Sequence, residues 1–360
     1  MAEGEEAPAG GAGPTGAEAD DSGTPRRWPR RLLKVGIGLL ASILVLALVV
    51  VIAFQVSYWP TTLLLRNLPA FNGDDPAAGQ VAAPAGVSSS LDVVYRAGDE
   101  DGRMDVFWPE GADGPLPTVV WVHGGAFVAG TKDGATTYLQ TIAAHGYTTI
   151  SVEYTKAPEQ HYPYQLGQVA DALAYVDAHA EELHVDPSRI VLGGDSAGGH
   201  IAAQTAMAIS QPGYAEATGL QRPLDAEQLV GTVLMCGAYD LHLPDYDDGI
   251  MGRFQRDIIW AYTGQKHFLD DPALAYASLP QHVTGELPPT FISAGNGDPL
   301  EAHSHSMAQA LAAAGVDVDA LFFPADTDPP VPHEYQMALH TEPAQLALTR
   351  VLDFLQAQVQ

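Results

Sequence analysis

From residue 91 onward, short apolar runs alternate with longer segments whose apolar residues recur at helical spacing. The continuous apolar run over residues 118–122 is typical of a strand buried on both faces. Residues 91–96 and 104–108 are predicted to form an opening hairpin. Further strands are predicted at 148–152, 190–192, 230–235, 290–293 and 318–323, and helices at 164–183, 304–314 and 344–357. Repeated strand–helix units predict an α/β fold with a mostly parallel central sheet and helices on both faces.

The alternation breaks between residues 240 and 279. We expect this segment to form a small cap inserted over the carboxyl ends of the strands, where ligands bind in such folds. Lids of this kind shape the substrate pocket. Residues 245–248, which read Asp-Tyr-Asp-Asp, are expected to be an acidic surface loop.

The pattern differs in the N-terminal quarter of the chain. Residues 1–25 are mostly small, acidic or proline residues, so a disordered acidic tail is expected there. Residues 26–59 combine a basic flank with an uncharged apolar run over 35–54, long enough as a helix to span about 30 Å of hydrocarbon. Residues 60–90 are expected to be a linker, and residues 91–360 the main folded domain.

Two interpretations of the apolar run remain open. The basic residues on its N-terminal side favour a retained signal anchor, with the N-terminus cytoplasmic and the folded domain extracytoplasmic. The alternative is a cleaved signal peptide and a secreted protein. The anchor is preferred because the run exceeds the usual length of a signal peptide and no clear cleavage site follows it.

Composition narrows the class of partner. The chain has 360 residues, with 16 Lys and Arg against 44 Asp and Glu, for a formal charge of −28. A chain this acidic is repelled by phosphate backbones, so nucleic acid is excluded as a partner. The single cysteine, Cys236, can form no intramolecular disulfide and is expected to be a small buried apolar residue.

Candidate chemistry begins at Ser196, the centre of the sequence Gly-Asp-Ser-Ala-Gly over residues 194–198. An apolar β-branched run precedes it and a helix-like segment follows it. A strand, a tight turn and a helix form the context in which this pattern presents a nucleophilic serine. The turn strains the serine backbone, so small neighbours are needed.

A nucleophilic serine needs a general base, and His333 is the candidate. It follows the last predicted strand in a short loop. His340 is the alternative, but it lies in a polar run before the terminal helix. The segment containing His303 and His305 is expected to be a solvated helix face, because residues two apart on a helix point in different directions.

The base needs an acid to orient it, and Asp298 is the candidate. It directly follows the strand predicted at 290–293, in a turn that its glycines permit. Asp326 and Asp328 are nearer to His333 in sequence, but no strand holds their proline-rich loop.

Backbone amides are expected to stabilise the oxyanion that forms during attack. One candidate is Ala197, directly after the nucleophile. The others are Gly124 and Gly125, in the loop after the strand over residues 118–122, because glycines leave room for a substrate carbonyl.

Over roughly residues 115–360 the chain resembles the hormone-sensitive-lipase-like branch of α/β-hydrolase esterases. The motifs that carry the resemblance are His-Gly-Gly-Ala-Phe at 123–127, Tyr-Thr-Lys-Ala-Pro-Glu at 154–159, Gly-Asp-Ser-Ala-Gly-Gly at 194–199, Asp-Pro-Leu at 298–300 and His-Glu at 333–334. The resemblance implies an α/β-hydrolase fold and, as catalytic triad, Ser196, Asp298 and His333. It also implies an oxyanion hole at Gly124, Gly125 and Ala197. The chain departs from the family at Ala126, where glycine is usual.

The sequence therefore predicts a membrane-anchored serine hydrolase that cleaves small-molecule carboxylic esters through an acyl-enzyme. No metal or organic cofactor is implied. A serine peptidase or amidase on the same fold is the first alternative, because the same triad attacks both bonds. A non-catalytic binding module on a hydrolase scaffold is the second, although all three triad residue types are present.

Overall fold

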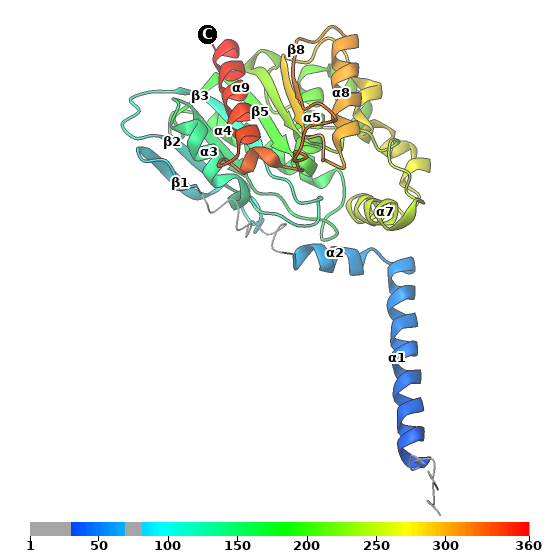
Figure 1. The fold of residues 1–360 in the computed structure, drawn as a ribbon. Coiled ribbons are helices and arrows are strands. Elements are labelled where there is room, and N and C mark those ends of the chain that lie inside the picture. The colour runs from blue at the N-terminus through cyan, green and yellow to red at the C-terminus, as the bar shows by residue number, and fades with distance from the viewer. Residues whose placement is uncertain (1–29, 69–80, 360) are drawn as a thin grey trace, which may run out of the picture. The chain divides into compact units, whose positions relative to one another are not determined.

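The computed structural model describes residues 30–68 and 81–359, and the chain divides into two compact units, Met1–Ala53 and Phe54–Gln360. Within the described residues, the first unit consists of most of helix α1 (Arg30–Val56), and the second contains every strand (Figure 1). The expected acidic tail over 1–25, the start of the basic flank and residues 69–80 of the expected linker lie outside the described residues.

Helix α1 is long and apolar enough to cross a membrane. Its segment Leu32–Val56 has 25 residues and a mean hydropathy of 3.1, and none of its apolar stretch is buried against the rest of the described chain. At 1.5 Å per residue it extends for roughly 37 Å, which exceeds the thickness of a hydrocarbon core. A membrane span and a signal sequence both meet this description.

The second unit is organised around one sheet, which has eight strands among the described residues. Their spatial order is β1-β2-β4-β3-β5-β6-β7-β8. The strands are β1 (Val87–Val94), β2 (Arg103–Pro109), β3 (Leu116–Val122), β4 (Thr148–Val152), β5 (Val185–Asp195), β6 (Leu229–Met235), β7 (Thr290–Ala294) and β8 (Val318–Phe322). Strand β2 pairs antiparallel with β1 and β4, and all other pairs are parallel. This confirms the predicted hairpin and the mostly parallel sheet.

Helices cover both faces of the sheet (Figure 1). The helices after α1 are α2 (Trp59–Arg66), α3 (Thr136–Ala143), α4 (Tyr164–Ala178), α5 (Ser196–Ser210), α6 (Pro212–Thr218), α7 (Gly249–Thr263), α8 (Glu301–Ala313) and α9 (Glu342–Gln358), with short 3₁₀ turns between them. Along β3, Val120 and Val122 belong to a core shared with α4, α5 and α8, whereas Val119 and Trp121 belong to a core shared with α3 and α9. Burial on both faces explains the uninterrupted apolar run.

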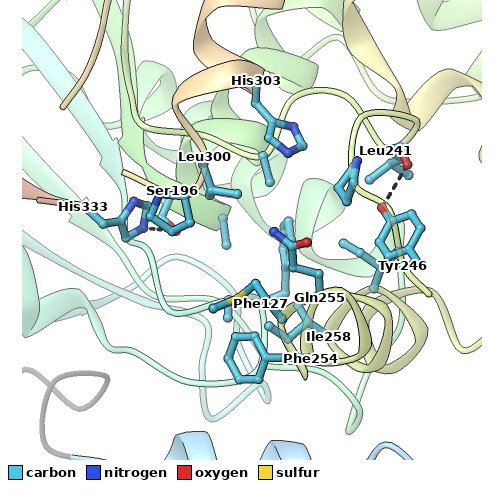
Figure 2. Close-up of a pocket in the computed structure, with 17 residues that line it drawn as sticks. Phe127, Ser196, Leu241, Tyr246, Phe254, Gln255, Ile258, Leu300, His303 and His333 are labelled. Carbon is cyan, nitrogen blue, oxygen red and sulfur yellow. Dashed lines mark hydrogen bonds between the residues drawn. The ribbon is translucent and has the colours of Figure 1, made fainter. Parts of the chain in front are cut away.

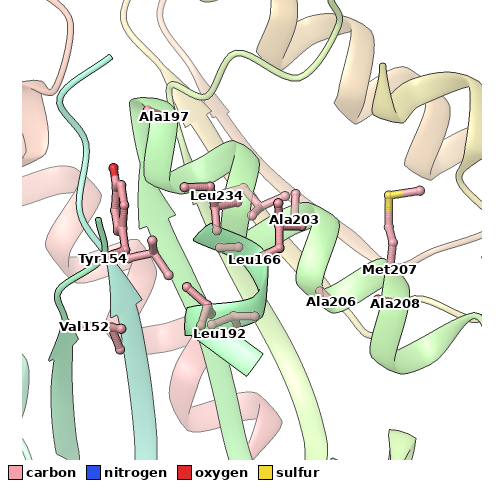
Figure 3. Packing of buried hydrophobic residues seen from close by; sticks show 14 of the residues in the cluster. Val152, Tyr154, Leu166, Leu192, Ala197, Ala203, Ala206, Met207, Ala208 and Leu234 are labelled. Carbon is pink, nitrogen blue, oxygen red and sulfur yellow. The ribbon is translucent and has the colours of Figure 1, made fainter. Parts of the chain in front are cut away.

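Helix α5 is buried along its whole length. Its glycines and alanines allow its backbone to lie close to the sheet, and Figure 3 shows Ala203 of this helix in the same buried cluster as the strand residues Leu192 and Leu234. This packing anchors the residue that begins the helix, Ser196, against the centre of the sheet.

The structure differs from the sequence analysis over residues 60–90. Instead of a linker throughout, this region contains helix α2, and the first strand begins at Val87. One side of α2 is buried at Thr61, Thr62 and Leu65, and the Thr61 hydroxyl donates a 2.7 Å hydrogen bond to Asp257 on α7. The α2 segment is itself largely apolar, and only the residues after it are rich in proline, glycine and alanine. A helix of eight residues is marginal alone, so tertiary contacts such as the bond to Asp257 order it.

Residues 240–279 contain α7 and several 3₁₀ turns and add no strand to the sheet. Asp245, Asp247 and Asp248 are exposed, as expected of an acidic loop. Tyr246 between them is buried, and its hydroxyl donates to the Leu241 carbonyl at 2.9 Å.

Candidate active site

Ser196 lies where β5 ends and α5 begins, with a φ of +52° that strains a residue bearing a side chain. The glycines around Ser196 are required because a Cβ at these positions would clash with neighbouring backbone. A Cβ at Gly194 would lie 2.6 Å from the Gly198 backbone, and a Cβ at Gly198 would lie 2.0 Å from the Val122 carbonyl oxygen. The turn thus holds the Ser196 hydroxyl at the carboxyl edge of the sheet.

His333 and Asp298 come together with Ser196, although they are far apart in the sequence (Figure 2 shows His333 beside Ser196). The imidazole Nε2 of His333 lies 2.9 Å from Ser196 Oγ, and its Nδ1 lies 2.9 Å from Asp298 Oδ1. Asp298 follows β7 and its side chain is fully buried. The same Oδ1 accepts the Leu300 N–H at 2.7 Å, which fixes the carboxylate.

The environment of His333 favours its protonated form. Burial lowers the pKa of the imidazole, but the adjacent Cys236, the hydrogen bond to Asp298 and the charge of Glu334 raise it, and the net pKa lies well above its ordinary value. A histidine with such a pKa holds a transferred proton readily, as a general base must.

Cys236 is a neighbour of the triad that sequence reasoning treated only as a buried apolar residue. It is buried and follows β6, and donor atoms of Cys236, Asp298 and His333 all lie within 4.8 Å of one another. Burial raises the pKa of the thiol, so it stays neutral. Both ring nitrogens of His333 already bond Ser196 and Asp298, so a metal ion here would have to break those contacts. The position of Cys236 at the carboxyl end of a predicted central strand was the sequence signal that could have placed it near the active site.

One predicted oxyanion donor is corrected by the structure. The N–H of Gly124 donates to Asp195 Oδ2 at 3.0 Å, so it is not available to a substrate. The described residues offer no acceptor to the N–H groups of Gly125 and Ala126. Ala126, with a φ of +54°, lines the pocket together with Ser196 and Ala197. The donor set that fits is therefore Gly125, Ala126 and Ala197.

A largely apolar pocket of about 150 Å³ adjoins Ser196 and His333 (Figure 2). Helix α7 contributes Phe254, Gln255 and Ile258 to its wall. His303 also lines it, whereas a solvated position was expected. It is buried, its Nδ1 accepts the Asp240 N–H at 3.1 Å, and burial lowers the pKa of its imidazole to about 4.

The alternative triad candidates lie on the surface. His340, Asp326 and Asp328 are exposed, and within the described part of the chain none of them forms a hydrogen bond or ion pair with Ser196. Of the candidate bases and acids named from the sequence, His333 is the one that contacts Ser196 in the described structure, and Asp298 is the one that contacts His333.

Comparisons with known proteins agree with this arrangement. Residues 119–328 match the sequence profile of the family described as alpha/beta hydrolase fold. Carboxylesterase NlhH of Mycobacterium tuberculosis (strain ATCC 25618 / H37Rv) is 32% identical over 256 residues, which cover 67% of this chain and 76% of that protein.

Solved structures of esterases share the fold. Esterase B from Lactobacillus rhamnosis, inhibited by a tributyrin phosphonate, superposes with a TM-score of 0.67 at 21% identity, covering 78% of this chain and 90% of that one. The thermophilic carboxylesterase EstE1, cloned from a metagenomic library, gives a TM-score of 0.66 at 21% identity, covering 85% and 99%. At these identities the similarity establishes the architecture.

Proposed function

Because the chain belongs to the α/β hydrolase fold family and is a carboxylic ester hydrolase, we propose that it acts through a Ser196–His333–Asp298 triad and an acyl-enzyme. The observation that carries the proposal is the imidazole of His333, which bridges the other two side chains at 2.9 Å on each side. This is the geometry that a nucleophile, a base and an orienting acid require.

In the first half of the reaction, Ser196 Oγ attacks the ester carbonyl carbon while His333 Nε2 takes the hydroxyl proton. The imidazolium is held by the Asp298 carboxylate. As the tetrahedral intermediate collapses, the bond to the alcohol oxygen breaks and His333 returns the proton to that oxygen. In the second half, His333 removes a proton from a water molecule while the water oxygen attacks the acyl carbon. As this second tetrahedral intermediate collapses, the bond between the acyl carbon and Ser196 Oγ breaks, the carboxylic acid leaves, and His333 returns the proton to Ser196 Oγ.

The oxyanion would be stabilised by the N–H groups of Gly125, Ala126 and Ala197. This assignment moves one donor from Gly124, which the family resemblance implied, to Ala126, a position where the family usually has glycine. The N–H group is the same in both residues, so the donor is kept and only a methyl group is added. Loss of one such donor typically costs about 3 kcal/mol of barrier stabilisation.

The substrate's apolar part would occupy the pocket under α7. A dry cavity of about 150 Å³ accommodates a molecule the size of benzene. We therefore expect esters of short acyl chains, up to about six carbons, to be preferred. A panel of p-nitrophenyl esters should show kcat/KM falling beyond that length, and a maximum at twelve carbons or more would contradict this pocket assignment.

The central experiment is the Ser196→Ala variant of the full chain in detergent. It should fold with an unchanged melting temperature, lose hydrolysis of p-nitrophenyl butyrate to the background rate and no longer react with a fluorophosphonate probe. Ser306→Ala is the matched control. Ser306 lies on α8, and its variant should keep both ester hydrolysis and reaction with the probe. Retained turnover in Ser196→Ala would reject the triad.

We further propose that α1 is a retained signal anchor, with the N-terminus cytoplasmic and the catalytic unit extracytoplasmic. The apolar segment of 25 residues, whose one charged residue is Lys34 near its start, and the basic residues before it in the sequence support this topology. The mass of the mature N-terminus tests it, because removal of residues up to the end of α1 would identify a cleaved signal instead.

A further inference from the structure

Two carboxyl groups that the proposed mechanism does not use meet beneath the oxyanion loop. Asp195 directly precedes the nucleophile, and Glu334 directly follows His333. A Cβ placed on Gly124 would lie 2.4 Å from Asp195 Oδ2 and 2.5 Å from Glu334 Oε1, so both carboxyl groups reach the same backbone position. The two oxygens therefore lie no more than 4.9 Å apart, the sum of 2.4 Å and 2.5 Å, and Glu334 adds to the effect of burial in raising the pKa of Asp195.

Asp195 is held in place by two N–H donors. The indole Nε1 of Trp121 donates to Oδ1 at 2.6 Å, and the N–H of Gly124 donates to Oδ2 at 3.0 Å. The side chain thus ties the central strand β3 and the oxyanion loop to the strand that carries the nucleophile. Its residue is only 4% exposed, so water cannot replace these contacts.

Glu334 reaches this point because its backbone is left-handed, with a φ of +53° and a ψ of +29°. A non-glycine residue adopts this conformation at a cost of roughly 1–2 kcal/mol, which implies that its side-chain contacts offset the strain. Its Oε1 lies 3.7 Å from His333 Nε2, the same nitrogen that faces Ser196.

No lysine or arginine among the described residues forms an ion pair with either carboxyl group. The basic side chain that the described structure brings to the pair is the imidazole of His333, 3.7 Å from Glu334 Oε1, and it carries no charge once His333 is deprotonated. Two carboxyl groups in contact then cannot both be ionised, because like charges at this distance repel strongly. We propose that Asp195 and Glu334 share one proton, and that the resulting carboxyl–carboxylate pair positions the oxyanion loop against the His333 loop. Both are positioning residues, and the inference rests on the proposed function.

The pair has a direct consequence for activity at alkaline pH. Burial, followed by the charge of Glu334, raises the pKa of Asp195 to about 8. When the shared proton leaves for solvent, two carboxylates repel each other beside Gly124 and the loops separate. Activity should therefore fall as the pH rises through the region of 8 to 9, which is opposite in sign to the rise that accompanies deprotonation of His333.

The groups that face the pair from surrounding elements are Tyr138, Tyr154, Tyr239, His123, His333 and Cys236. Burial raises the pKa of the three tyrosines and of the cysteine, so they stay neutral across this range. His123 bonds Glu153 and the Gly124 carbonyl through its two ring nitrogens. His333 is the base itself, and its deprotonation raises activity rather than lowering it.

The test compares Glu334→Gln with Glu334→Ala in the full chain in detergent. Glutamine supplies a permanent N–H to Asp195 and cannot lose it, so it mimics the protonated pair at every pH. Alanine removes the bond. Glu182→Gln is the matched control, because Glu182 is exposed and lies in the turn after α4. Rates with p-nitrophenyl butyrate are measured from pH 6 to pH 9.5, with Ser196→Ala subtracted as the blank.

We expect Glu334→Gln to keep kcat within threefold of wild type at pH 7 and to lose the alkaline decline. Glu334→Ala should lower kcat about 10- to 100-fold with KM nearly unchanged, since a misplacement of 1 Å has this effect on rate. If Glu334→Ala fails to fold by circular dichroism, Glu334→Gln decides alone.

Three outcomes would overturn the shared proton. In the first, Glu334→Gln is as impaired as the alanine variant. In the second, it declines at alkaline pH in parallel with wild type and Glu182→Gln. In the third, wild type itself shows no alkaline decline up to pH 9.5. Turnover by the Ser196→Ala blank is a separate result, because it would reject the triad and leave the carboxyl pair to be judged from the other two variants.

Discussion

Replacement of Asp298 by asparagine separates the two roles of an orienting acid, namely its charge and its choice of imidazole tautomer. In many triads the amide turns its NH₂ group toward the histidine, which holds the wrong tautomer and lowers kcat about 10⁴-fold. Here the Leu300 N–H points at Oδ1 from 2.7 Å, and the same oxygen lies 2.9 Å from His333 Nδ1. An NH₂ group in that place would face the Leu300 N–H, so the amide oxygen should occupy it.

The asparagine variant should then keep the productive tautomer and lose only the charge. At an effective dielectric constant of about 20, a carboxylate about 4 Å from the imidazolium contributes roughly 4 kcal/mol as an upper bound. Each 1.36 kcal/mol is a factor of ten in rate, so kcat should fall about 10²- to 10³-fold. Asp298→Ala, which removes the acceptor altogether, should fall about 10⁴-fold or more.

The pH profile gives a second measurement of the same reasoning. The pKa of His333 is raised in part by its hydrogen bond to Asp298, and the base works only when deprotonated. Wild-type activity should therefore rise with pH through a midpoint above the ordinary imidazole value. Loss of the Asp298 charge lowers the pKa, so in Asp298→Asn the rising limb should move to lower pH.

Stopped-flow and steady-state hydrolysis of p-nitrophenyl butyrate provide the rates. Asp326→Asn and Asp328→Asn are the controls, because both carboxylates are exposed and should leave kcat within about twofold of wild type. A loss of 10⁴-fold or more in Asp298→Asn, equal to that of the alanine variant and without a shift of the rising limb, would refute the role given to the Leu300 N–H.

Two further predictions concern stability. Gly198→Ala would place a Cβ 2.0 Å from the Val122 carbonyl oxygen, so it should lower the unfolding free energy by about 3 kcal/mol or more in a thermal melt. Gly213→Ala is the control, because Gly213 has open space around it and the change should be no more than about 1 kcal/mol. A Gly198→Ala melting curve equal to that of wild type would contradict the contact. Thr61→Val removes the 2.7 Å donor to the buried Asp257 carboxylate and should lower stability by about 1–3 kcal/mol in urea titrations, and an unchanged midpoint would show that α2 is not held by this bond.

Much of the fold follows from local patterns that the sequence carries. The strand β3 reads as an unbroken apolar run because both of its faces are covered, and the order of strands and helices then leaves few topologies. Ser196, Asp298 and His333 could each be placed in a loop after a strand. Parallel strands bring their carboxyl ends to one edge, so position along the chain was enough to predict that these three residues meet.

The remaining features depend on partners that are distant in the sequence. Gly124 was a reasonable oxyanion donor until its N–H met a carboxylate 71 residues away, which transfers the role to Ala126. Glu334 was only the neighbour of a histidine until its left-handed backbone directed it to Asp195. Helix α2 lies mostly within the residues expected to form a linker, and a hydrogen bond to Asp257 ties it to α7.

The physical reason for this division is the range of the interactions involved. Hydrophobic periodicity and tight turns depend on residues a few positions apart, so the sequence alone predicts the strands, the helices and the turn at Ser196. The choice of hydrogen-bond partner for a buried amide or carboxyl group depends on which groups the folded sheet brings within 3 Å. For this protein the sequence was enough to select the three residues proposed as the triad. Only the tertiary structure decided which backbone amides are free to face a substrate and which two carboxyl groups are brought together.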